Sequence, residues 1–412
     1  MLSYIVIGTI AITTSTTTTT THGFSVGDGV SAKPRTTNTI TTSQVYGWQG
    51  RFSTRLCDAS SALYEVQEQM LVDRGKKEAE LMKDNYTPLE ANKPKGVGAS
   101  GGFGGGGGGG GKSQNKGNKS KSAIKEEGKS HAKVLKAQGV VRIDNVLPGD
   151  LADRLREYVV ELRATSTAEV ASGQAKSIDR FADVLLKENR CDLKIPLGPP
   201  VVMEALENVF VRSAVGSSVD ALLGRKASLY ELACLISDPG SNRQVVHPDN
   251  PYLPGRDKPT LLTCFIALQD VTLEMGPTVW IPQTHTEAMH QRFGDTSTKD
   301  DLLSTQPAVL GLLTKGSCAI FDSRLLHCGS ANSHPDQSRA LFYVSMKNPD
   351  VGYPGNVGSI RQEIGSAGLT LEELTKELGG SSEKKKKKSG NTSSSSSMAK
   401  GGRLETIAAT LK

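Results

Sequence analysis

The stretch GSCAIFDSRLLHCGSANSHPDQSRALFYVSM, residues 316–346, contains two short apolar runs joined by a polar loop. Short apolar runs bounded by turn residues are typical of β-strands. Similar runs recur from residue 227 to residue 349, whereas helical spacing of Leu and Val dominates residues 149–162. Helices followed by many short strands indicate an α+β domain whose core is a β-sandwich or an open barrel.

Composition indicates one large domain with long additional segments. The chain has 412 residues, a formal net charge of +6 and only 5% aromatic residues, which is low for a chain that packs throughout. Eight consecutive glycines at 104–111 predict a linker. We expect four parts: a signal-like segment, a transit-like low-complexity region with one helix near 61–84, the globular domain, and a C-terminal helix with a Ser/Lys-rich tail, at residues 1–23, 24–137, 138–350 and 351–412. Thr370 and Glu373 predict the start of that last helix as a capping box, and Gly379 predicts its C-cap.

The N-terminal segment has features of a targeting sequence. Its apolar stretch, Leu2–Ile12, is too short for a transmembrane helix, which needs about 20 residues, so we expect no transmembrane span. Thr21 and Gly23 suit a cleavage before Phe24, and Ser25–Arg55 is rich in Ser and Thr with few acidic residues. This arrangement resembles the bipartite plastid leaders of algae with secondary plastids. Plastid import is the expected destination; the secretory pathway, the mitochondrion and an unprocessed tail are the alternatives.

The positive charge is concentrated in two Lys-rich segments, residues 115–129 and 384–388. Such blocks are usually solvated tails, and no interleaved aromatic residues suggest a surface on which bases stack. We therefore expect no specific nucleic-acid partner. The six cysteines show no Cys-x-x-Cys spacing, which argues against a zinc ribbon and against a disulfide framework.

The triplet His-Pro-Asp occurs twice, at residues 247–249 and 334–336. A His and an Asp two positions apart at a strand end point the same way and can supply two ligands of a two-His-one-carboxylate iron site. The third ligand is then a His from a distant strand. His334 is the last His of the chain, so the second triplet has no later partner, whereas the first has several. The first triplet is the expected site, and the second is expected to form a turn.

A cosubstrate with a carboxylate group narrows the choice of the third ligand. If 2-oxoglutarate binds the iron, its far carboxylate needs a cation, and Arg pairs with carboxylates bidentately. His327 is followed on the next predicted strand by Arg339, whereas the next Arg after His285 and His290 is Arg292, which lies in a polar segment. The combination that meets every requirement is His247, Asp249, His327 and Arg339.

With these residues the chain resembles the phytanoyl-CoA dioxygenase family of Fe(II)- and 2-oxoglutarate-dependent oxygenases over about 139–349. The resemblance is carried by RQVVHPDN, FIALQDVTLEMGPTVWIPQTH and FDSRLLHCGSANSHPDQSRALFYVSM, which begin at residues 243, 265 and 321. Gln283-Thr284 stands where the family usually has Gly-Ser. The resemblance implies a double-stranded β-helix core of the jelly-roll or cupin type with flanking helices, and composition predicts long disordered segments at both ends. The resemblance also implies that Fe(II) is bound by His247, Asp249 and His327.

The resemblance further implies which residues bind the cosubstrate. Arg339 would pair with the distal carboxylate of 2-oxoglutarate. Phe265 matches a position that lines the cosubstrate pocket in relatives, and Cys234 matches another. Thr263 shares a strand face with Phe265, and Tyr343 shares one with Arg339, so both hydroxyl groups are expected to donate to the cosubstrate.

The implied reaction is hydroxylation of a C–H bond of a small organic substrate by O2, with conversion of 2-oxoglutarate to succinate and CO2. Asp249 agrees with hydroxylation, since halogenating relatives lack a carboxylate at this position. Ascorbate is a candidate reductant. The alternative is a non-catalytic β-sandwich binding module whose basic tails dock an anionic partner. The sequence leaves open the substrate, the oligomeric state and the roles of Tyr230 and Glu231.

Overall fold

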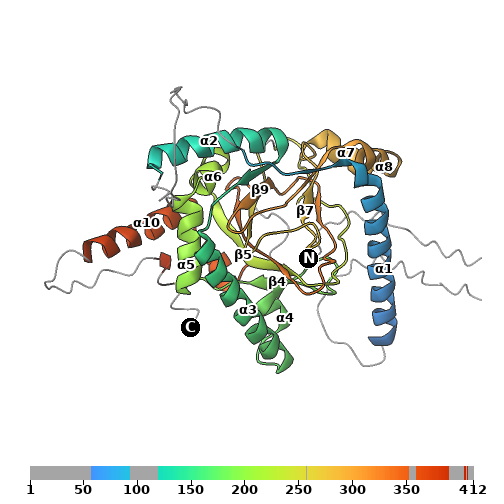
Figure 1. Ribbon diagram of the computed structural model, residues 1–412, viewed down its shortest axis with the longest axis horizontal. Helices are drawn as coiled ribbons and strands as arrows, with labels where there is room; N and C mark the ends of the chain where they lie inside the picture. The colour runs from blue at the N-terminus through green and yellow to red at the C-terminus, as the bar shows by residue number, and fades with distance from the viewer. Residues whose placement is uncertain are drawn as a thin grey trace, which may run out of the picture.

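The computed structural model describes residues 57–92, 119–256, 258–351, 359–388, 403–404 and 406. Its architecture is α+β, with a seven-stranded sheet, a four-stranded sheet and several flanking helices (Figure 1). The predicted signal-like segment, most of the transit-like region, the glycine linker and most of the C-terminal tail lie outside the described residues. No described helix is long and apolar enough to cross a membrane.

Every neighbouring pair of strands in the larger sheet is antiparallel. Its spatial order is β2 (Val140–Ile143), β9 (Cys318–Asp322), β6 (Leu261–Ala267), β11 (Arg339–Lys347), β5 (Ser228–Ser237), β4 (Arg190–Lys194) and β3 (Phe181–Ala182). The smaller sheet has the order β1 (Tyr86–Pro88), β8 (Ala308–Leu310), β7 (Thr278–Trp280) and β10 (His327–Gly329). The short apolar runs that were expected to form strands therefore do so.

The two faces of the larger sheet differ, because successive strand residues point to opposite sides. One face carries Leu, Ile, Val and Phe side chains that pack against helices and form the largest core cluster. The other face carries Arg339, Tyr343 and Ser345 of β11 and is directed toward the smaller sheet. Trp280 of β7 meets Phe321 of β9 there, with ring centroids 5.7 Å apart. The functional side chains thus lie between the two sheets.

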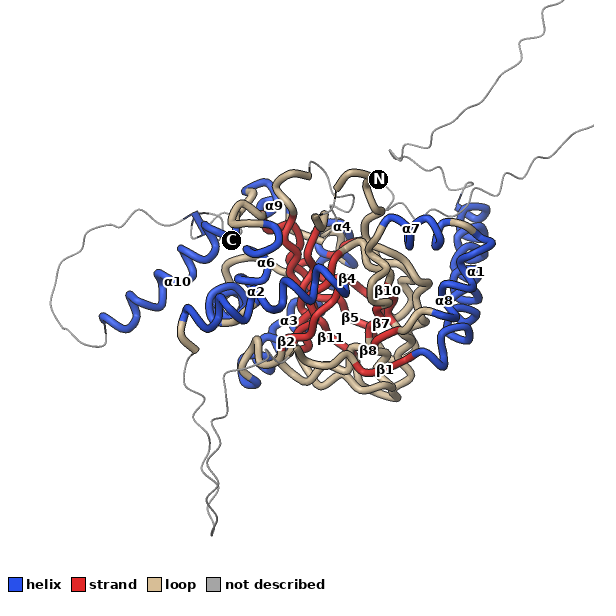
Figure 2. The backbone as a smooth tube through the Cα atoms, turned by 90° about the horizontal axis from the view of Figure 1, so that it is seen from above, coloured by secondary structure: helices blue, strands red, loops and turns tan. Residues whose placement is uncertain are grey.

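Helices surround the strands, which are gathered in the middle of the molecule (Figure 2). They are α1 (Cys57–Met82), α2 (Lys121–Gln138), α3 (Gly149–Ala171), α4 (Ser177–Arg180), α5 (Pro200–Glu207), α6 (Val215–Leu223), α7 (Glu287–Gly294), α8 (Thr296–Thr305), α9 (Gln362–Ala367) and α10 (Leu371–Lys388), with a 3-10 turn η1 (Lys83–Asn85) and a π-helical turn η2 (Asn208–Arg212). The helices expected near 61–84 and from 149 onward are confirmed as α1 and α3. The capping box of α10 is confirmed, because Thr370 and Glu373 exchange side-chain-to-backbone hydrogen bonds. The predicted C-cap at Gly379 is wrong, since α10 continues past this residue.

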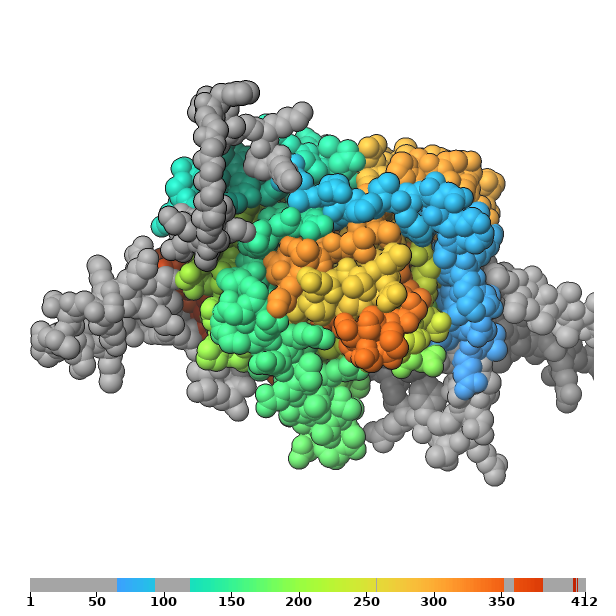
Figure 3. Space-filling model, in the orientation of Figure 1, coloured from blue at the N-terminus to red at the C-terminus, as the bar shows by residue number. Residues whose placement is uncertain are grey.

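Two helices that precede residue 139 pack on the sheets. Met82 at the end of α1 is fully buried, and so, almost completely, are Leu89 after β1 and Leu135 of α2. The segment around α1 and β1, coloured blue, runs along the top and down one side of the face shown in Figure 3. The folded unit therefore includes residues on the N-terminal side of the boundary expected at 138.

Candidate metal centre

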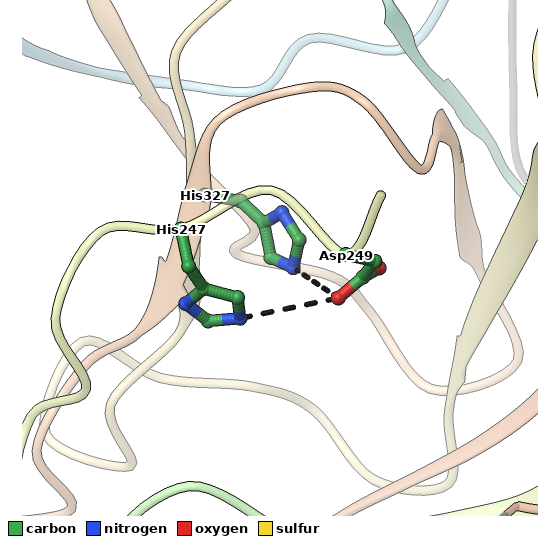
Figure 4. Close-up of side chains that lie close together, drawn as sticks. All are labelled: His247, Asp249 and His327. Carbon is green, nitrogen blue, oxygen red and sulfur yellow. Dashed lines mark ion pairs between the residues drawn. The ribbon is translucent and has the colours of Figure 1, made fainter. Parts of the chain in front are cut away.

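His247 and His327 are cross-strand neighbours. The backbone N–H of each donates to the carbonyl of the other, both at 2.9 Å, although the two residues are far apart in the sequence. Their ring centroids lie 4.6 Å apart. Asp249 follows two residues after His247, and one ligand atom from each of the three side chains lies within 4.8 Å of the others (Figure 4). The structure therefore brings the three predicted metal ligands together.

A hydrogen bond between Nδ1 and a backbone carbonyl orients each of the two imidazoles. Nδ1 of His247 lies 2.8 Å from the carbonyl of Val245, and Nδ1 of His327 lies 2.8 Å from the carbonyl of Leu325. A carbonyl can only accept, so each Nδ1 carries the proton and each Nε2 is left with a lone pair. The Nε2 atoms point toward Asp249 Oδ1, at 3.9 Å from His247 and 3.5 Å from His327. Three electron-pair donors converge on one point, as a divalent metal ion requires.

The charge states of His247 and Asp249 also suit a cation, whereas Asp249, against the effect of burial, raises the pKa of His327. Burial, together with the neighbouring His327, lowers the pKa of His247 to about 4, so this ring is neutral at neutral pH. Burial opposes ionisation of Asp249, but the adjacent His327 more than offsets this and lowers the pKa of the carboxyl group. A neutral imidazole and an ionised carboxylate are the forms that bind a metal.

Arg339 lies close to this centre, and some of its N–H groups have no hydrogen-bond partner among the described residues. Its side chain is fully buried, and its Nη2 donates to Ser237 Oγ at 3.0 Å. Its Nε and Nη1 have no hydrogen-bond partner among the described residues. Burial and the neighbouring Arg190 lower the pKa of Arg339 to about 9. Buried guanidinium donors without an acceptor are costly, so this position fits a bound carboxylate.

Arg190 is a second buried arginine beside Arg339, and the sequence interpretation missed it. Its Nε donates to the same Ser237 Oγ at 3.1 Å and its Nη2 donates to the carbonyl of Asn242 at 3.0 Å, while Nη1 has no partner among the described residues. Burial lowers its pKa to about 10. The alternation of Arg190, Asp192 and Lys194 in β4 was the available signal, since charged residues at every second strand position share one face.

Gly329 leaves room next to Arg339. A Cβ atom at this position would lie 2.7 Å from Gln244 Oε1 and 3.5 Å from Arg339 Nη2. Gln244 is held there, because its Oε1 accepts from the Gly329 N–H at 3.0 Å and its Nε2 donates to the carbonyl of Leu185 at 3.2 Å. The unpartnered donors of Arg339 and the absence of a side chain at Gly329 fit a carboxylate-bearing cosubstrate next to the metal centre.

A cavity of about 580 Å³ opens beside the three metal-ligand candidates. Phe265, Thr263 and Tyr343 line it, as expected, and so does Glu231. The hydroxyl groups have protein partners, however. Thr263 Oγ1 lies 2.9 Å from Ser345 Oγ, and Tyr343 Oη donates to Asp192 Oδ2 at 2.7 Å. Phe265 therefore lines the cavity as expected. Thr263 and Tyr343 already make hydrogen bonds to protein groups, and a hydrogen bond from either hydroxyl to the cosubstrate would have to compete with these.

Cys234 is not at the site, and this expectation needs correction. It lies on the opposite face of β5, fully buried among the residues that pack against the helices. Its cross-strand neighbours are Phe342 and Leu193, which face the same way. Strand alternation explains the error, because the pocket face of β5 carries Glu231, Ala233 and Leu235 instead.

The second His-Pro-Asp triplet forms a turn, as expected. Nδ1 of His334 accepts from the backbone N–H groups of Asp336 and Gln337, at 3.3 and 3.1 Å. The N–H of His334 in turn donates to Asn332 Oδ1 at 3.0 Å. The same three residues thus stabilise a loop here and converge on a metal-binding geometry at 247–249.

Helix α1 supports the ligand segment through Glu78, another residue that the sequence interpretation missed. Its side chain is 2% exposed, and Oε2 accepts from the backbone N–H of Val246 at 2.6 Å. Arg74 and Lys299 form ion pairs with the same carboxylate, at 3.0 and 3.1 Å. Because Val246 directly precedes His247, this network holds the backbone from which the first ligand projects.

Residues 135–340, half of the chain, match the family model described as Phytanoyl-CoA dioxygenase (PhyH). Among curated proteins, none matches the chain. Of the solved structures, the non-haem α-ketoglutarate-dependent carbocyclase SnoK from nogalamycin biosynthesis aligns with a TM-score of 0.40 and 22% identity, over 58% of this chain and 88% of that one. EctD from S. alaskensis with bound Fe aligns with a TM-score of 0.39 and 17% identity, over 57% and 78%. HygX from Streptomyces hygroscopicus with nickel and 2-oxoglutarate aligns with a TM-score of 0.37 and 13% identity, over 53% and 87%.

Proposed function

The chain belongs to the phytanoyl-CoA dioxygenase family, and from that premise we propose that it hydroxylates a C–H bond of a small organic molecule. It is an Fe(II)- and 2-oxoglutarate-dependent oxygenase, and we assign its paired sheets to a double-stranded β-helix core. One oxygen atom of O2 enters the hydroxylated product and the other enters succinate, with release of CO2. The observation that carries the proposal is the convergence of His247, Asp249 and His327 beside the unpartnered donors of Arg339.

The roles of the protein groups follow from their positions. His247, Asp249 and His327 would hold Fe(II), and Arg339 would bind the distal carboxylate of 2-oxoglutarate through the guanidinium donors that have no partner among the described residues. Phe265 supplies an apolar wall to the same cavity. When bound, iron and 2-oxoglutarate supply the oxidising chemistry, and the protein supplies position and a water-poor pocket.

Turnover of 2-oxoglutarate tests the proposal directly. Full-chain protein with Fe(II) and O2 should consume 2-oxoglutarate and release succinate, slowly even without an organic substrate. His247→Ala and Asp249→Ala should each abolish Fe(II) binding and turnover. His334→Ala, in the second triplet, is the matched control and should retain both. Turnover that survives the first two substitutions contradicts the ligand assignment, and a wild-type protein that neither binds Fe(II) nor consumes 2-oxoglutarate favours the binding-module alternative.

Import into a plastid is a separate proposal, supported by the composition of the first 55 residues. Fusion of residues 1–56 to a fluorescent protein in an alga with secondary plastids should direct the fluorescence to that organelle. Fluorescence in the mitochondrion or the culture medium instead would identify one of the two alternative destinations.

A further inference from the structure

The cavity beside the metal centre carries an excess of acidic side chains. Five carboxyl groups line it, but only two side chains that are always cationic, Arg74 and Lys299. Both of these cations are paired with Glu78. The acidic residues are Asp183, Asp192, Glu231, Asp249 and Glu287. Asp183 pairs with Lys187 outside the lining, and Asp249 belongs to the metal centre, so Asp192, Glu231 and Glu287 are left without a cationic partner in the lining.

Asp192 presents an unsatisfied oxygen to this cavity. Its side chain is 5% exposed, and Oδ2 accepts from Tyr343 Oη at 2.7 Å and from Ser359 Oγ at 3.0 Å, whereas Oδ1 has no partner among the described residues. Lys194, on the same face of β4, donates to the carbonyl of Ile178 at 2.5 Å. Burial raises the pKa of Asp192 to about 6. A buried carboxylate oxygen without a donor is expensive, so the position calls for a donor from a ligand.

Glu231 adds a second buried carboxyl group to the same wall. It is 8% exposed and accepts a hydrogen bond from Ser345, which in turn lies 2.9 Å from Thr263 Oγ1. Burial raises its pKa to about 8. A cation bound nearby would stabilise the ionised forms of both carboxyl groups, because opposite charges in a cavity of low dielectric attract strongly.

Glu231 and the arginine pair lie at different ends of the sheet, and Asp192 lies between them, opposite Leu235 in the row next to Arg190. Arg190, Ser237 and Arg339 form one cross-strand row, and Glu231, Ser345 and Thr263 form the third row beyond it. At about 3.4 Å per residue along an antiparallel strand, Arg339 and Ser345 are roughly 20 Å apart. The side chain of Asp192 is directed toward the Glu231 side, because its Oδ2 accepts from Tyr343 in the row between them. An anion beside the arginines and a cation beside the two carboxyl groups would therefore bind at different positions along the sheet.

Aromatic rings lie beside these two carboxyl groups. Phe265 and Tyr343 both line the cavity, with ring centroids 5.4 Å apart, and they form the cross-strand row next to that of Glu231. Tyr252 and Phe293 line the cavity elsewhere, and Lys299 already lies over the Phe293 ring, 4.1 Å from its centroid. The faces of aromatic rings attract cations, and this attraction increases in desolvated sites. Carboxylates and aromatic faces around one cavity are the groups that recognise an organic ammonium ion.

We propose that the organic substrate is a cation, whose ammonium-type group binds between Asp192 and Glu231. The inference rests on the proposed function and specifies its substrate class. A neutral alkyl chain, such as the tail of an acyl-CoA thioester, would leave Asp192 Oδ1 without a partner inside a closed cavity. A positively charged group supplies the missing counter-charge and packs on the aromatic rings.

Choline and its neutral isostere 3,3-dimethylbutan-1-ol test this assignment. The two probes have nearly the same shape, and the quaternary nitrogen of choline has no lone pair with which to ligate a metal. Dissociation constants are measured by ligand-observed NMR on the full chain, with and without Fe(II). We expect choline to bind about tenfold more tightly than the alcohol, which corresponds to about 1.4 kcal/mol. Equal binding of both probes, or binding of neither at tens of millimolar, overturns the proposal.

Two variants of the carboxyl groups and one control variant test whether Asp192 and Glu231 cause the preference for choline. Asp192→Asn combined with Glu231→Gln should remove the preference for choline and leave the affinity for the alcohol unchanged; Asp192→Asn alone serves if the double variant does not fold. Asp183→Asn is the control, because this carboxylate also lines the cavity but already pairs with Lys187 at 2.8 Å. A preference for choline that persists in the double variant overturns the assignment. A wild-type protein that consumes 2-oxoglutarate but shows no preference for choline contradicts only this inference. A wild-type protein that prefers choline but does not use 2-oxoglutarate contradicts only the proposed function.

Discussion

Removing the residues before Gly139 should unfold the protein, although the family match begins only at residue 135. The removed part contributes four large buried apolar side chains, those of Met82, Leu89, Ile124 and Leu135. Burying one such side chain stabilises a protein by about 1.5–3 kcal/mol, so their loss costs roughly 6–12 kcal/mol. Domains are typically stable by only about 5–15 kcal/mol. A protein that starts at Gly139 is therefore expected to be unfolded or barely stable.

Two intermediate truncations turn this into a measurement. A protein that starts at Lys119 keeps α2 but loses Met82 and Leu89, which predicts a loss of about 3–6 kcal/mol. A protein that starts at Cys57 keeps every described contact and should match the full chain. Equilibrium unfolding in urea, followed by circular dichroism, gives the free energy of each. If the protein that starts at Gly139 unfolds with the same free energy as the full chain, then α1 and α2 do not belong to the folded unit.

Three further perturbations test individual groups. Arg190→Met should raise the urea midpoint of the free protein by removing an unpaired buried charge, and should weaken 2-oxoglutarate binding in an anaerobic titration; a lower midpoint would contradict this. Gly329→Ala should weaken 2-oxoglutarate binding several-fold without changing Fe(II) affinity, because the new Cβ would lie 2.7 Å from Gln244 Oε1; equal loss of both affinities would point to general damage. Burial raises the pKa of Glu231 from 4.5 to about 8, so the folded state keeps a proton that the unfolded chain releases, and stability should fall as the pH rises from about 4.5 to 8. Glu231→Gln should remove about 3–5 kcal/mol of that fall in urea unfolding measured at several pH values, and an unchanged slope would contradict it.

The metal-ligand candidates could be predicted from the sequence because their constraints are strict. A strand end fixes the relation between His247 and Asp249, and the need for a later His followed by an Arg on the next strand leaves few combinations. Cys234 shows the limit of matching by resemblance alone. An alignment error of one strand position places a side chain on the opposite face of the sheet, and Cys234 faces the helices rather than the cavity.

The long-range contacts that support the metal centre could not be predicted from the sequence. Glu78 lies on a helix whose amphipathic pattern is recognisable, but no local pattern shows that its carboxylate accepts from the N–H of Val246. Helix α2 follows a segment of glycine and lysine, and this composition hides its start. Arg190 looks like an ordinary charged residue at a strand end until Ser237 and Arg339 are found beside it.

The paired backbone bonds between His247 and His327 hold the two imidazoles at their mutual distance before any ion arrives. A site built in advance in this way has little freedom to reshape itself around a preferred element, and affinities of nitrogen and oxygen ligands follow the general order of the divalent transition metals. By that order, cobalt, nickel and zinc should each bind at least as tightly as iron. The cell's supply of metals, rather than selection by the protein, would decide which ion this chain carries.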